Sequence, residues 1–334
     1  MNIFNNLFEK KKYLDCPFMK NSLHFFYDAV RACCVNVSGP VFYSDYKGEN
    51  IDFDYIYNER KKVFDGILTA KEKKYIPACC ENCCDVEKFF IDDKPQSFNN
   101  EIKTVYFHNH MSCNARCVYC SYDYFDRGYG YDVLNFVKDM IERRILLPDA
   151  SIYMSGGEIT ITNEFEELLS LLLSYMNNKV EILTSGIKYC KSIQEAFSKD
   201  KCKLIISLDS GNKNVYEKIK KVDCFDKVVQ NLKDYISFSD NAKSNILLKY
   251  IIVDGINDTV QEIEDFLKLA SELGILNVRI DFDFVKYRFS DAVKLPKHYF
   301  ELIEYFDASA KEKNLSINTY GQIEAILQKA KENG

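Results

Sequence analysis

The segment Ile102-Lys-Thr-Val-Tyr-Phe-His-Asn-His110 is followed, two residues later, by Cys113-Asn-Ala-Arg-Cys-Val-Tyr-Cys120. The first run is rich in the β-branched and aromatic residues that favour a strand. In the second run, spacings of four and then three residues place three thiolates on one short loop. An iron–sulfur cube takes one thiolate per iron, so this loop would leave one iron open. We therefore expect a metal cluster that binds and activates a small molecule.

From about residue 101 the sequence alternates predicted strands with predicted helices. Strands are predicted at residues 102–110, 151–155, 180–184, 203–208, 245–253 and 277–284, and helices at 132–144, 164–175, 191–199, 225–236, 259–273, 296–313 and 322–331. This alternation indicates βαβ units and a parallel sheet, closed as a partial barrel or open as a doubly wound sheet. In both architectures the functional site lies at the carboxyl ends of the strands.

Polar or glycine-rich turns end five consecutive predicted strands. The cysteine loop ends the first, and the others end in Gly156, Gly157 and Glu158, in Ser185, in Ser207 and Asp209, and in the run at 254–258. Turns at neighbouring strand ends meet at one edge of a sheet. We expect these residues to surround one cofactor.

Together these residues resemble the radical S-adenosylmethionine (radical SAM) superfamily over about residues 101–290. Its CxxxCxxC loop is matched by Cys113, Cys117 and Cys120, and its Gly-Gly-Glu motif by residues 156–158. The resemblance implies an α/β fold with a partial (β/α)6 TIM-like barrel at residues 96–315. It also implies a [4Fe–4S] cluster on the three cysteines, with S-adenosylmethionine bound at the fourth iron.

The resemblance also implies roles for single residues. Glu158 and the backbone of Gly156 and Gly157 would meet the ammonium of the cofactor, Tyr119 the adenine, Ser207 and Asp209 the ribose or carboxylate; Ser185 stands where relatives often carry asparagine, and Lys220 where several place a carboxylate-binding arginine. A one-electron donor such as flavodoxin or ferredoxin would reduce the cluster. The cofactor would yield a 5′-deoxyadenosyl radical that abstracts a hydrogen atom from an unactivated C–H of the substrate.

Simpler interpretations of these motifs remain open. The three cysteines with His108 or His110 would make a zinc site, although zinc would not account for the Gly-Gly-Glu motif. The glycine pair alone is typical of a strand-to-helix turn. Ser207 and Asp209 alone would serve as a helix cap.

A second group of cysteines lies near the start of the chain, where ten of the 13 cysteines fall within the first 120 residues. Cys16, Cys33 or Cys34, Cys80 and Cys83 would supply four thiolates, enough to ligate a second cube fully. Residues 1–95 resemble the auxiliary-cluster modules called SPASM or twitch domains, with a hairpin at 23–34, although such modules usually follow the barrel. A zinc knuckle is the alternative. Cys34, Cys79 and Cys84 would be alternate ligands or buried thiols.

Two thiols beyond the predicted strand ends suggest a further step. Cys190 and Cys224 would return a hydrogen atom to a substrate radical if they lie near it. The alternative is that they are small apolar fillers of the core.

Composition excludes several classes of protein. The 334 residues are 47% hydrophobic and 28% charged with a net charge of −6, which provides no basic footprint for nucleic acid. No apolar run approaches 18 residues, so no membrane span is expected, and the first 12 residues lack a secretory core. We expect a cytoplasmic protein whose cysteines bind metal, with a C-terminal helix in residues 316–334.

The resemblance implies a radical SAM enzyme of oxidoreductase, epimerase or transferase type. A sugar or other small metabolite is slightly favoured as substrate, because residues 1–95 lack the winged-helix periodicity of leader-peptide binding. The alternative is an enzyme that modifies peptides or proteins, as an epimerase or maturase. The alternative of another class is a metal-stabilised binding or electron-transfer protein without catalysis.

Overall fold

The fold is known from a computed structural model that describes residues 11–33, 41–44, 53–72, 74–77, 80, 86–95, 98–120, 130–283 and 296–318. The chain divides into two compact units, each discontinuous in sequence. Unit one comprises Met1–Met111, Gly128–Gly156 and Ser174–Asn178, and unit two comprises Ser112–Arg127, Gly157–Leu173 and Lys179–Gly334. The boundaries expected at residues 95 and 315 stay a prediction.

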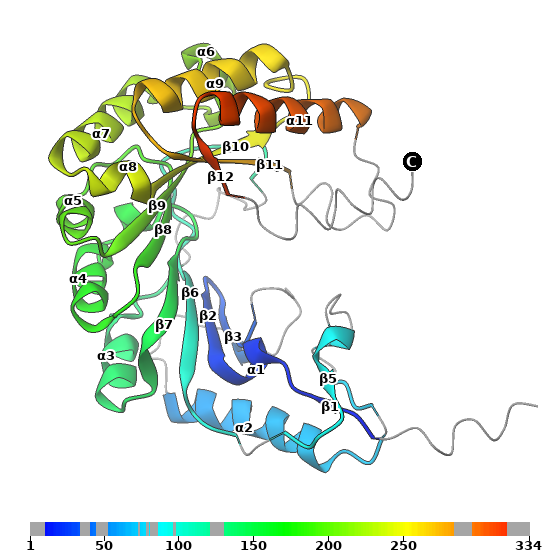
Figure 1. The fold of residues 1–334 in the computed structure, drawn as a ribbon. Coiled ribbons are helices and arrows are strands. Elements are labelled where there is room, and N and C mark those ends of the chain that lie inside the picture. Colours follow the sequence, from blue (N-terminus) through cyan, green and yellow to red (C-terminus); the bar gives the residue numbers. More distant parts are fainter. Residues whose placement is uncertain are drawn as a thin grey trace, which may run out of the picture. The chain divides into compact units, whose positions relative to one another are not determined.

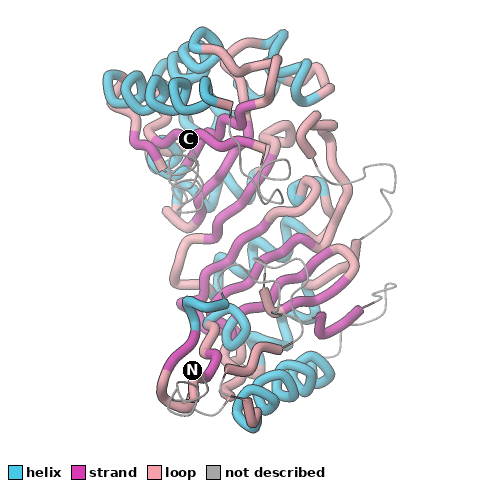
Figure 2. The backbone as a smooth tube through the Cα atoms, turned by 90° about the vertical axis from the view of Figure 1, so that its right-hand side faces the viewer, coloured by secondary structure: helices cyan, strands magenta, loops and turns pink. Residues whose placement is uncertain are grey.

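Unit one is built on β6 (Ile102–His108), which has β7 (Leu146–Met154) and β2 (Ser22–Phe26) as parallel neighbours. β3 (Ala29–Arg31) pairs antiparallel with β2, and β4 (Val41–Ser44) pairs antiparallel with β3. Figure 2 colours the strands magenta and the helices cyan. A separate antiparallel pair joins β1 (Tyr13–Leu14) to β5 (Phe90–Ile91). The described helices of this unit are α1 (Pro17–Asn21), α2 (Phe53–Thr69), η3 (Val86–Phe89) and α3 (Leu134–Glu142).

The N-terminal residues add strands to the sheet that contains β6, the first predicted strand of the barrel. The predicted hairpin is confirmed, because β2 and β3 run antiparallel with Phe26 opposite Ala29. β2 also runs parallel to β6, which the sequence did not indicate, and Phe25 lies opposite Phe107. The rings of Phe25 and Phe107 stack with 5.4 Å between their centroids. Aromatic stacking across neighbouring strands therefore helps to join the N-terminal segment to β6.

Unit two contains five parallel strands, each paired with the next: β8 (Val180–Thr184), β9 (Cys202–Ser207), β10 (Ile246–Ile252), β11 (Asn277–Phe282) and β12 (Ser316–Ile317). Helices occupy the connections (Figure 1): η4 (Ile159–Ile161), α4 (Phe165–Tyr175), α5 (Lys191–Ser198), α6 (Lys213–Lys220), α7 (Phe225–Phe238), α8 (Asn241–Asn245), α9 (Val260–Glu272) and α11 (Lys297–Glu312). The predicted α/β class with a parallel sheet is confirmed.

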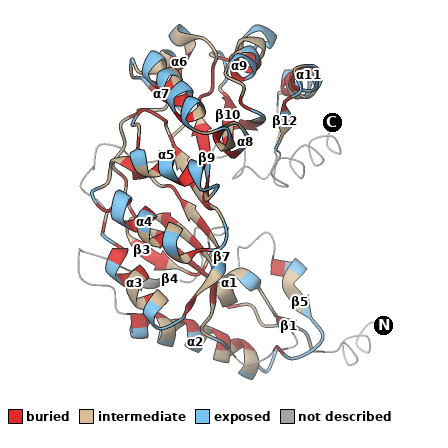
Figure 3. Cartoon of the chain, turned by 60° about the vertical axis from the view of Figure 1, so that its left-hand side comes forward, coloured by how far each residue is buried: buried red, intermediate tan, exposed pale blue. Residues whose placement is uncertain are grey.

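The core of unit two lies between the strands and the helices that cover them. Successive side chains of a strand point to opposite faces, and alternate residues of β10, namely Leu248, Tyr250 and Ile252, are fully buried. Tyr250 meets Phe266 of α9 edge to face, with ring centroids 5.1 Å apart. The outward faces of the helices are exposed, as Figure 3 shows for α5 and α7. Burial of one strand face against the helices leaves the carboxyl ends of the strands free to carry polar turns.

The predicted strands and helices between residues 102 and 313 are confirmed, with differences at their ends. β7 begins at Leu146 instead of residue 151, and the short helix α8 ends at Asn245, where a strand was expected to begin. α2 and β12 were not predicted. The helix expected at 322–331, with most of the C-terminal segment, lies outside the described residues. Within the described part of the chain, every helix is too short or too polar to cross a membrane.

Candidate functional site

The cysteine loop lies in unit two and is held by the last turn of α6. Cys113, Cys117 and Cys120 are partly buried. The Arg116 N–H donates to the carbonyl of Lys220 at 2.8 Å, and the N–H of residue 118 donates to the carbonyl of residue 219 at 2.9 Å. The last carbonyls of a helix have no partner within the helix, so the loop supplies donors for two of them. The C-terminus of α6 thereby sets the position of the cysteines.

α6 has clear signals at both of its ends. The Asn212 side chain caps its first turn by accepting from the N–H groups of Asn214 at 2.9 Å and Val215 at 3.4 Å, which favours helix initiation. The helix ends after Lys220, because Lys221 adopts the left-handed conformation with φ of 56°. The start and end of α6 are thus fixed locally, and its last carbonyls point to the loop.

The loop is also braced from within and from the end of β8. The Arg116 guanidinium donates to the carbonyls of Cys113 at 2.9 Å and Ala115 at 2.5 Å. Ser185, which follows β8, donates its hydroxyl to Asn114 Oδ1 at 3.0 Å. Burial raises the pKa of Cys113 to about 11. The free thiol therefore keeps its proton at neutral pH and would release it on binding a metal.

Glu158 links η4 to the end of β8 through a buried carboxylate. One oxygen accepts from the Thr160 N–H at 3.3 Å, the Thr160 hydroxyl at 2.6 Å and the Thr184 hydroxyl at 2.6 Å; the other accepts from the Ser185 N–H at 2.6 Å. The N–H of Glu158 itself donates to the carbonyl of Ser112 at 2.7 Å. Hydrogen bonds to a charged acceptor are the stronger kind. Glu158 therefore has a structural role in addition to the cofactor contact expected of it.

Gly156 follows β7 in unit one, with φ of +114°. A Cβ at this position would come within 2.8 Å of the carbonyl oxygen of His110, closer than any side chain tolerates. The neighbouring backbone thus requires glycine here even without a ligand. Gly157 belongs to unit two and is partly buried. The ammonium contact expected of this pair stays a prediction.

Asp209, just after β9, is fully buried and has a left-handed φ of 62°. Its Oδ1 accepts from the N–H of Ile251 at 2.9 Å. Its Oδ2 accepts from the Tyr119 hydroxyl at 2.6 Å and from the ammonium of Lys220. Lys220 also donates to the Tyr119 oxygen at 2.8 Å. Three residues expected to contact the cofactor therefore contact one another.

The charges in this group agree with the direction of its hydrogen bonds. Burial alone lowers the pKa of Lys220, but Asp209 and Cys117 raise it, and the net pKa is raised. Burial, and then the charge of Asp209, raise the pKa of Tyr119. Both groups are therefore protonated at neutral pH, as donors must be.

Asn257 belongs to the site, although it was not among the residues chosen from the sequence. It is fully buried, and its amide nitrogen donates to the carbonyls of Asp209 at 2.8 Å and Ile251 at 2.9 Å. Its Oδ1 accepts from the N–H of Val253 at 2.7 Å. Asn257 thus fastens the turn after β10 to Asp209. The polar run at 254–258 was the available signal, but nothing in it distinguishes Asn257.

Three other expected residues lie in unit two: Ser207 at the end of β9, Cys190 directly before α5, and Cys224 directly before α7, separated from β9 by α6. Ser207 is the last residue of β9 and is partly buried. Cys190 is 1% exposed, and its N–H donates to the Tyr235 hydroxyl at 2.8 Å. Burial raises the pKa of Cys190 to about 12. Cys224 precedes α7 and is partly exposed. The chemical roles expected of these three residues stay predictions.

Two of the front cysteines share one apolar cluster in unit one. Cys16 and Cys80 are partly buried and pack against this cluster, whose buried members are Leu14, Met19, Phe64, Ile67 and Val86. The pairing of β1 with β5 brings the residues just before Cys16 beside the segment that follows η3. Residues 16 and 80, far apart in sequence, are therefore held by a common core.

Cys33 follows β3 and is tied indirectly to the helix that begins after Cys16. The Ser22 hydroxyl lies within hydrogen-bonding distance of the carbonyls of Phe18, in α1, and of Ala32. This contact holds the end of β3 against α1. The other front cysteines, Cys34, Cys79, Cys83 and Cys84, lie outside the described residues.

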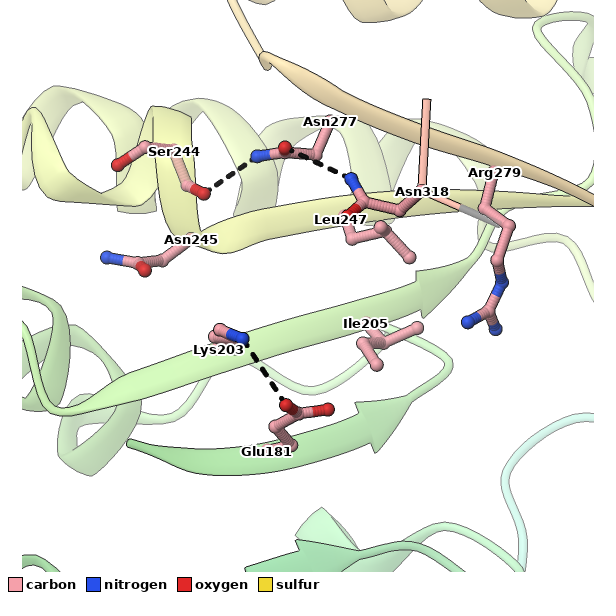
Figure 4. A pocket seen from close by; sticks show the side chains of 9 residues that line it. All are labelled: Glu181, Lys203, Ile205, Ser244, Asn245, Leu247, Asn277, Arg279 and Asn318. Atoms are coloured by element: carbon pink, nitrogen blue, oxygen red, sulfur yellow. Dashed lines mark hydrogen bonds and ion pairs between the residues drawn. The ribbon is translucent and has the colours of Figure 1, made fainter. Parts of the chain in front are cut away.

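A pocket of about 200 Å³ opens near the amino ends of the strands in unit two (Figure 4). It is lined by Glu181, Lys203, Ile205, Ser244, Asn245, Leu247, Asn277, Arg279 and Asn318. Lys203 and Glu181 form an ion pair at 3.4 Å. Its lining includes none of the expected site residues that the structure describes. Sites in parallel α/β sheets lie at the opposite, carboxyl ends, so this pocket is separate from the cysteine site.

Asp254, Asp258 and His298 offer three ligand atoms within 4.8 Å of one another. His298 Nε2 lies 3.3 Å from Asp258 Oδ2, and the Tyr299 hydroxyl donates to Asp254. Carboxylate and imidazole ligands suit divalent cations, whereas thiolates suit iron–sulfur clusters. These residues therefore do not provide a second cluster site.

Residues 111–270 match the model of the Radical SAM superfamily. The matched segment contains the cysteine loop, Glu158, Asp209 and Lys220. This match supports the predicted relationship of the chain to the radical SAM superfamily. The matched residues run from the cysteine loop to α9 and include the hydrogen-bonded residues described above.

A curated protein is similar to part of the chain. Over 178 residues the chain is 28% identical to GTP 3′,8-cyclase of Nautilia profundicola, an alignment that covers 51% of this chain and 53% of that protein. The chain therefore spans about half the length of this curated relative.

Two solved structures share the fold at low identity. Streptococcus suis SuiB bound to precursor peptide SuiA has a TM-score of 0.53 at 14% identity, covering 83% of this chain and 57% of that chain. Native anSMEcpe with bound AdoMet has a TM-score of 0.50 at 18% identity, covering 64% of this chain and 63% of that chain. At these identities the likeness shows the fold alone.

Proposed function

We propose that this protein is a radical SAM enzyme that holds a [4Fe–4S] cluster on Cys113, Cys117 and Cys120 and binds S-adenosylmethionine. The observation that carries the proposal is a loop of three partly buried thiols, fastened to α6 and to Ser185, within the segment that matches the family. Such a donor set suits a cube with one iron left open. When bound, the cofactor would supply a 5′-deoxyadenosyl radical for hydrogen abstraction from a substrate C–H.

The residues of the chain bind and orient in this proposal. We assign the ammonium of the cofactor to Glu158 and to the backbone of Gly156 and Gly157, and the ribose to Ser207. Ser185 joins the cysteine loop to the end of β8. Support comes from the position of Glu158, Ser185 and Ser207 at carboxyl ends of strands or in the turns that follow.

The test begins with anaerobic reconstitution with iron and sulfide, followed by dithionite and S-adenosylmethionine. We expect 5′-deoxyadenosine from the wild-type protein and none from the triple variant Cys113→Ala/Cys117→Ala/Cys120→Ala. Cys202→Ala is the matched control, because Cys202 lies in β9 and is fully buried. A reconstituted wild-type protein that makes no 5′-deoxyadenosine would favour the non-catalytic alternative.

For the substrate we propose a sugar or other small metabolite, with oxidation, epimerisation or linkage as the reaction. Support comes from the sequence of residues 1–95, which lacks the winged-helix periodicity of leader-peptide binding. A peptide is the second candidate, because the SuiB structure that shares this fold is a complex with its precursor peptide. Comparing 5′-deoxyadenosine yields with sugar and peptide libraries separates the two, since a true substrate raises the yield.

We further propose a second [4Fe–4S] cluster on Cys16, Cys33, Cys80 and Cys83, in a SPASM-like module. Its support is the common apolar cluster beneath Cys16 and Cys80. Two cubes would give about eight irons per chain and one would give about four. The double variant Cys16→Ser/Cys80→Ser should therefore lose about half of the iron. Zinc in place of that half would identify a zinc knuckle.

Cys190 and Cys224 are our proposed hydrogen-atom donors in an epimerising reaction. The raised pKa of Cys190 keeps hydrogen on its sulfur at neutral pH. The S–H bond would break as the substrate C–H bond forms, and a one-electron donor such as flavodoxin or ferredoxin, in a reducing cytoplasm, would reduce the sulfur radical. In D2O the product should gain one deuterium, and Cys190→Ala or Cys224→Ala should abolish the gain. Deuterium uptake unchanged in both variants would contradict this role.

A further inference from the structure

We propose that Tyr119, Asp209 and Lys220 are positioning residues that clamp the cysteine loop onto α6 and the end of β9. In this assignment Lys220 acts on the cluster through the clamp and does not bind the carboxylate of the cofactor. The inference rests on the proposed function, because it concerns the same cluster.

Lys220 holds the cysteine loop in two ways. Its main-chain carbonyl accepts from the N–H of Arg116 at 2.8 Å. Its ammonium donates to Asp209 and, at 2.8 Å, to Tyr119, which lies within the loop between the second and third cysteines. One residue at the end of α6 thus fixes the backbone of the loop and one of its side chains.

Asp209 is the fixed point of the clamp. Its Oδ1 is held by the N–H of Ile251 in β10, and its carbonyl is held by Asn257. Its Oδ2 accepts from both Tyr119 and Lys220. The cysteine loop, the end of α6 and the end of β9 therefore meet at a single buried carboxylate oxygen.

The ion pair is closed to a ligand as it stands. The side chains of Lys220 and Asp209 are 1% and 0% exposed. An ammonium has three donors, and two of those of Lys220 are taken by Asp209 and Tyr119. A ligand carboxylate would reach Lys220 only if this pair moved apart. Breaking a buried pair is strongly unfavourable, so the geometry favours positioning over ligand binding.

The position of Lys220 also suits a neighbour of the cluster. Its hydrogen-bond partners Arg116 and Tyr119 both lie in the loop that carries the three cysteines. Groups just outside a metal site orient its ligands and tune the metal. Asp209 balances the charge of Lys220, so the clamp places an ammonium near the thiolates without adding net charge to the interior.

The test compares anaerobically reconstituted wild-type protein with Lys220→Met, Asp209→Asn and the double variant. Lys218→Met is the matched control, because Lys218 is an exposed lysine of the same helix. Two quantities are measured: the rate of iron release to a chelator without S-adenosylmethionine, and the Kd for S-adenosylmethionine from its effect on the electron paramagnetic resonance spectrum.

We expect each single variant to release iron at least about tenfold faster than wild type, because it leaves one buried charge without its partner. The double variant should release iron more slowly than the product of the single effects, because the two residues are coupled. The Kd should change by less than about threefold, within the scatter expected of residues that do not contact the ligand. Lys218→Met should match wild type in both quantities.

The opposite pattern overturns the inference. If Lys220→Met weakens S-adenosylmethionine binding about tenfold or more while iron release stays at the control rate, Lys220 contacts the ligand. If a variant fails to fold by circular dichroism, Tyr119→Phe carries the test, since it removes one hydroxyl and should change the spectrum of the ligand-free reduced cluster. An unchanged spectrum would refute the clamp. Wild-type protein that takes up no cluster refutes the proposed function as well, whereas normal uptake with control-like variants refutes the clamp alone.

Discussion

Asn257→Asp tests how the turn after β10 supports the site. The substitution keeps the shape of the side chain but replaces its amide group by an oxygen. That amide now donates to the carbonyls of Asp209 and Ile251 at 2.8 and 2.9 Å. The new oxygen would face two carbonyl oxygens at these distances. Two lost hydrogen bonds of about 1 kcal/mol each, and a buried acceptor left without a donor at about 1–3 kcal/mol, predict a loss of about 3–5 kcal/mol in the free energy of unfolding.

The assay is urea unfolding followed by circular dichroism, because the chain has no tryptophan. Asn257→Ala leaves the same carbonyls without donors but adds no charge, so its loss should be smaller than that of Asn257→Asp. Asn214→Asp is the control, since Asn214 is exposed in α6, and it should change stability by no more than about 0.5 kcal/mol. If Asn257→Asp fell within about 1 kcal/mol of wild type, the buried hydrogen bonds assigned to Asn257 would be wrong.

Three other outcomes follow from the packing. Gly211→Ala should abolish soluble expression, because its Cβ would lie 2.1 Å from a backbone oxygen of α9, whereas Gly255→Ala, with φ of +69° and nothing within 4 Å, should cost only about 1 kcal/mol by thermal melting. Burial lowers the pKa of His108 from 6.5 to about 4. As the pH falls, the unfolded chain therefore binds this proton before the folded chain does, and stability should decrease between about pH 6.5 and about pH 4. His108→Asn should lessen that decrease, as measured by urea titrations at several pH values. Burial raises the pKa of Cys202 to about 12. Iodoacetamide at pH 8 should therefore label the partly exposed Cys224 before Cys202, as mass spectrometry of the native protein would show.

The alternation of strands and helices was predictable because it depends on local sequence patterns. β8 and β9 are short runs of apolar residues bounded by polar turns, and each is followed or preceded by a helix of eight or more residues. Short apolar runs of this length between helices are typical of buried strands in a parallel sheet. The position of the cysteine loop could also be predicted, because the loop follows the predicted strand at residues 102–110.

Elements that depend on distant partners could not be predicted in the same way. α2 has buried positions at Phe53, Ile56, Arg60, Phe64 and Ile67. A charged residue at the centre of that face hides its helical periodicity. The burial of Arg60 is explained by its contacts with the Lys20 carbonyl and, at 5.3 Å, with the ring of Phe98. The parallel pairing of β2 with β6 joins strands about 80 residues apart, for which sequence spacing carries no signal.

The candidate site was predictable in its membership more than in its contacts. Tyr119, Asp209 and Lys220 were all chosen from the sequence, but as separate contacts to a cofactor. The hydrogen bond between Tyr119 and Asp209 spans 90 residues. A motif identifies a carboxylate at a strand end, but it cannot show whether that carboxylate faces a ligand or a buried lysine. That distinction depends on the neighbouring helix α6, whose start is set by Asn212 and whose end is set by Lys221.

Two buried carboxylates hold the cysteine loop from consecutive strand ends. Glu158 binds the Ser185 N–H at the end of β8, and the Ser185 hydroxyl reaches Asn114 in the loop. Asp209, after β9, binds the loop through Tyr119. Both oxygens of each carboxylate accept hydrogen bonds from the protein, so the loop is positioned before any cofactor arrives. Preorganisation of this kind lowers the entropy lost on binding, so an acid such as Glu158 can hold the scaffold and still meet a ligand.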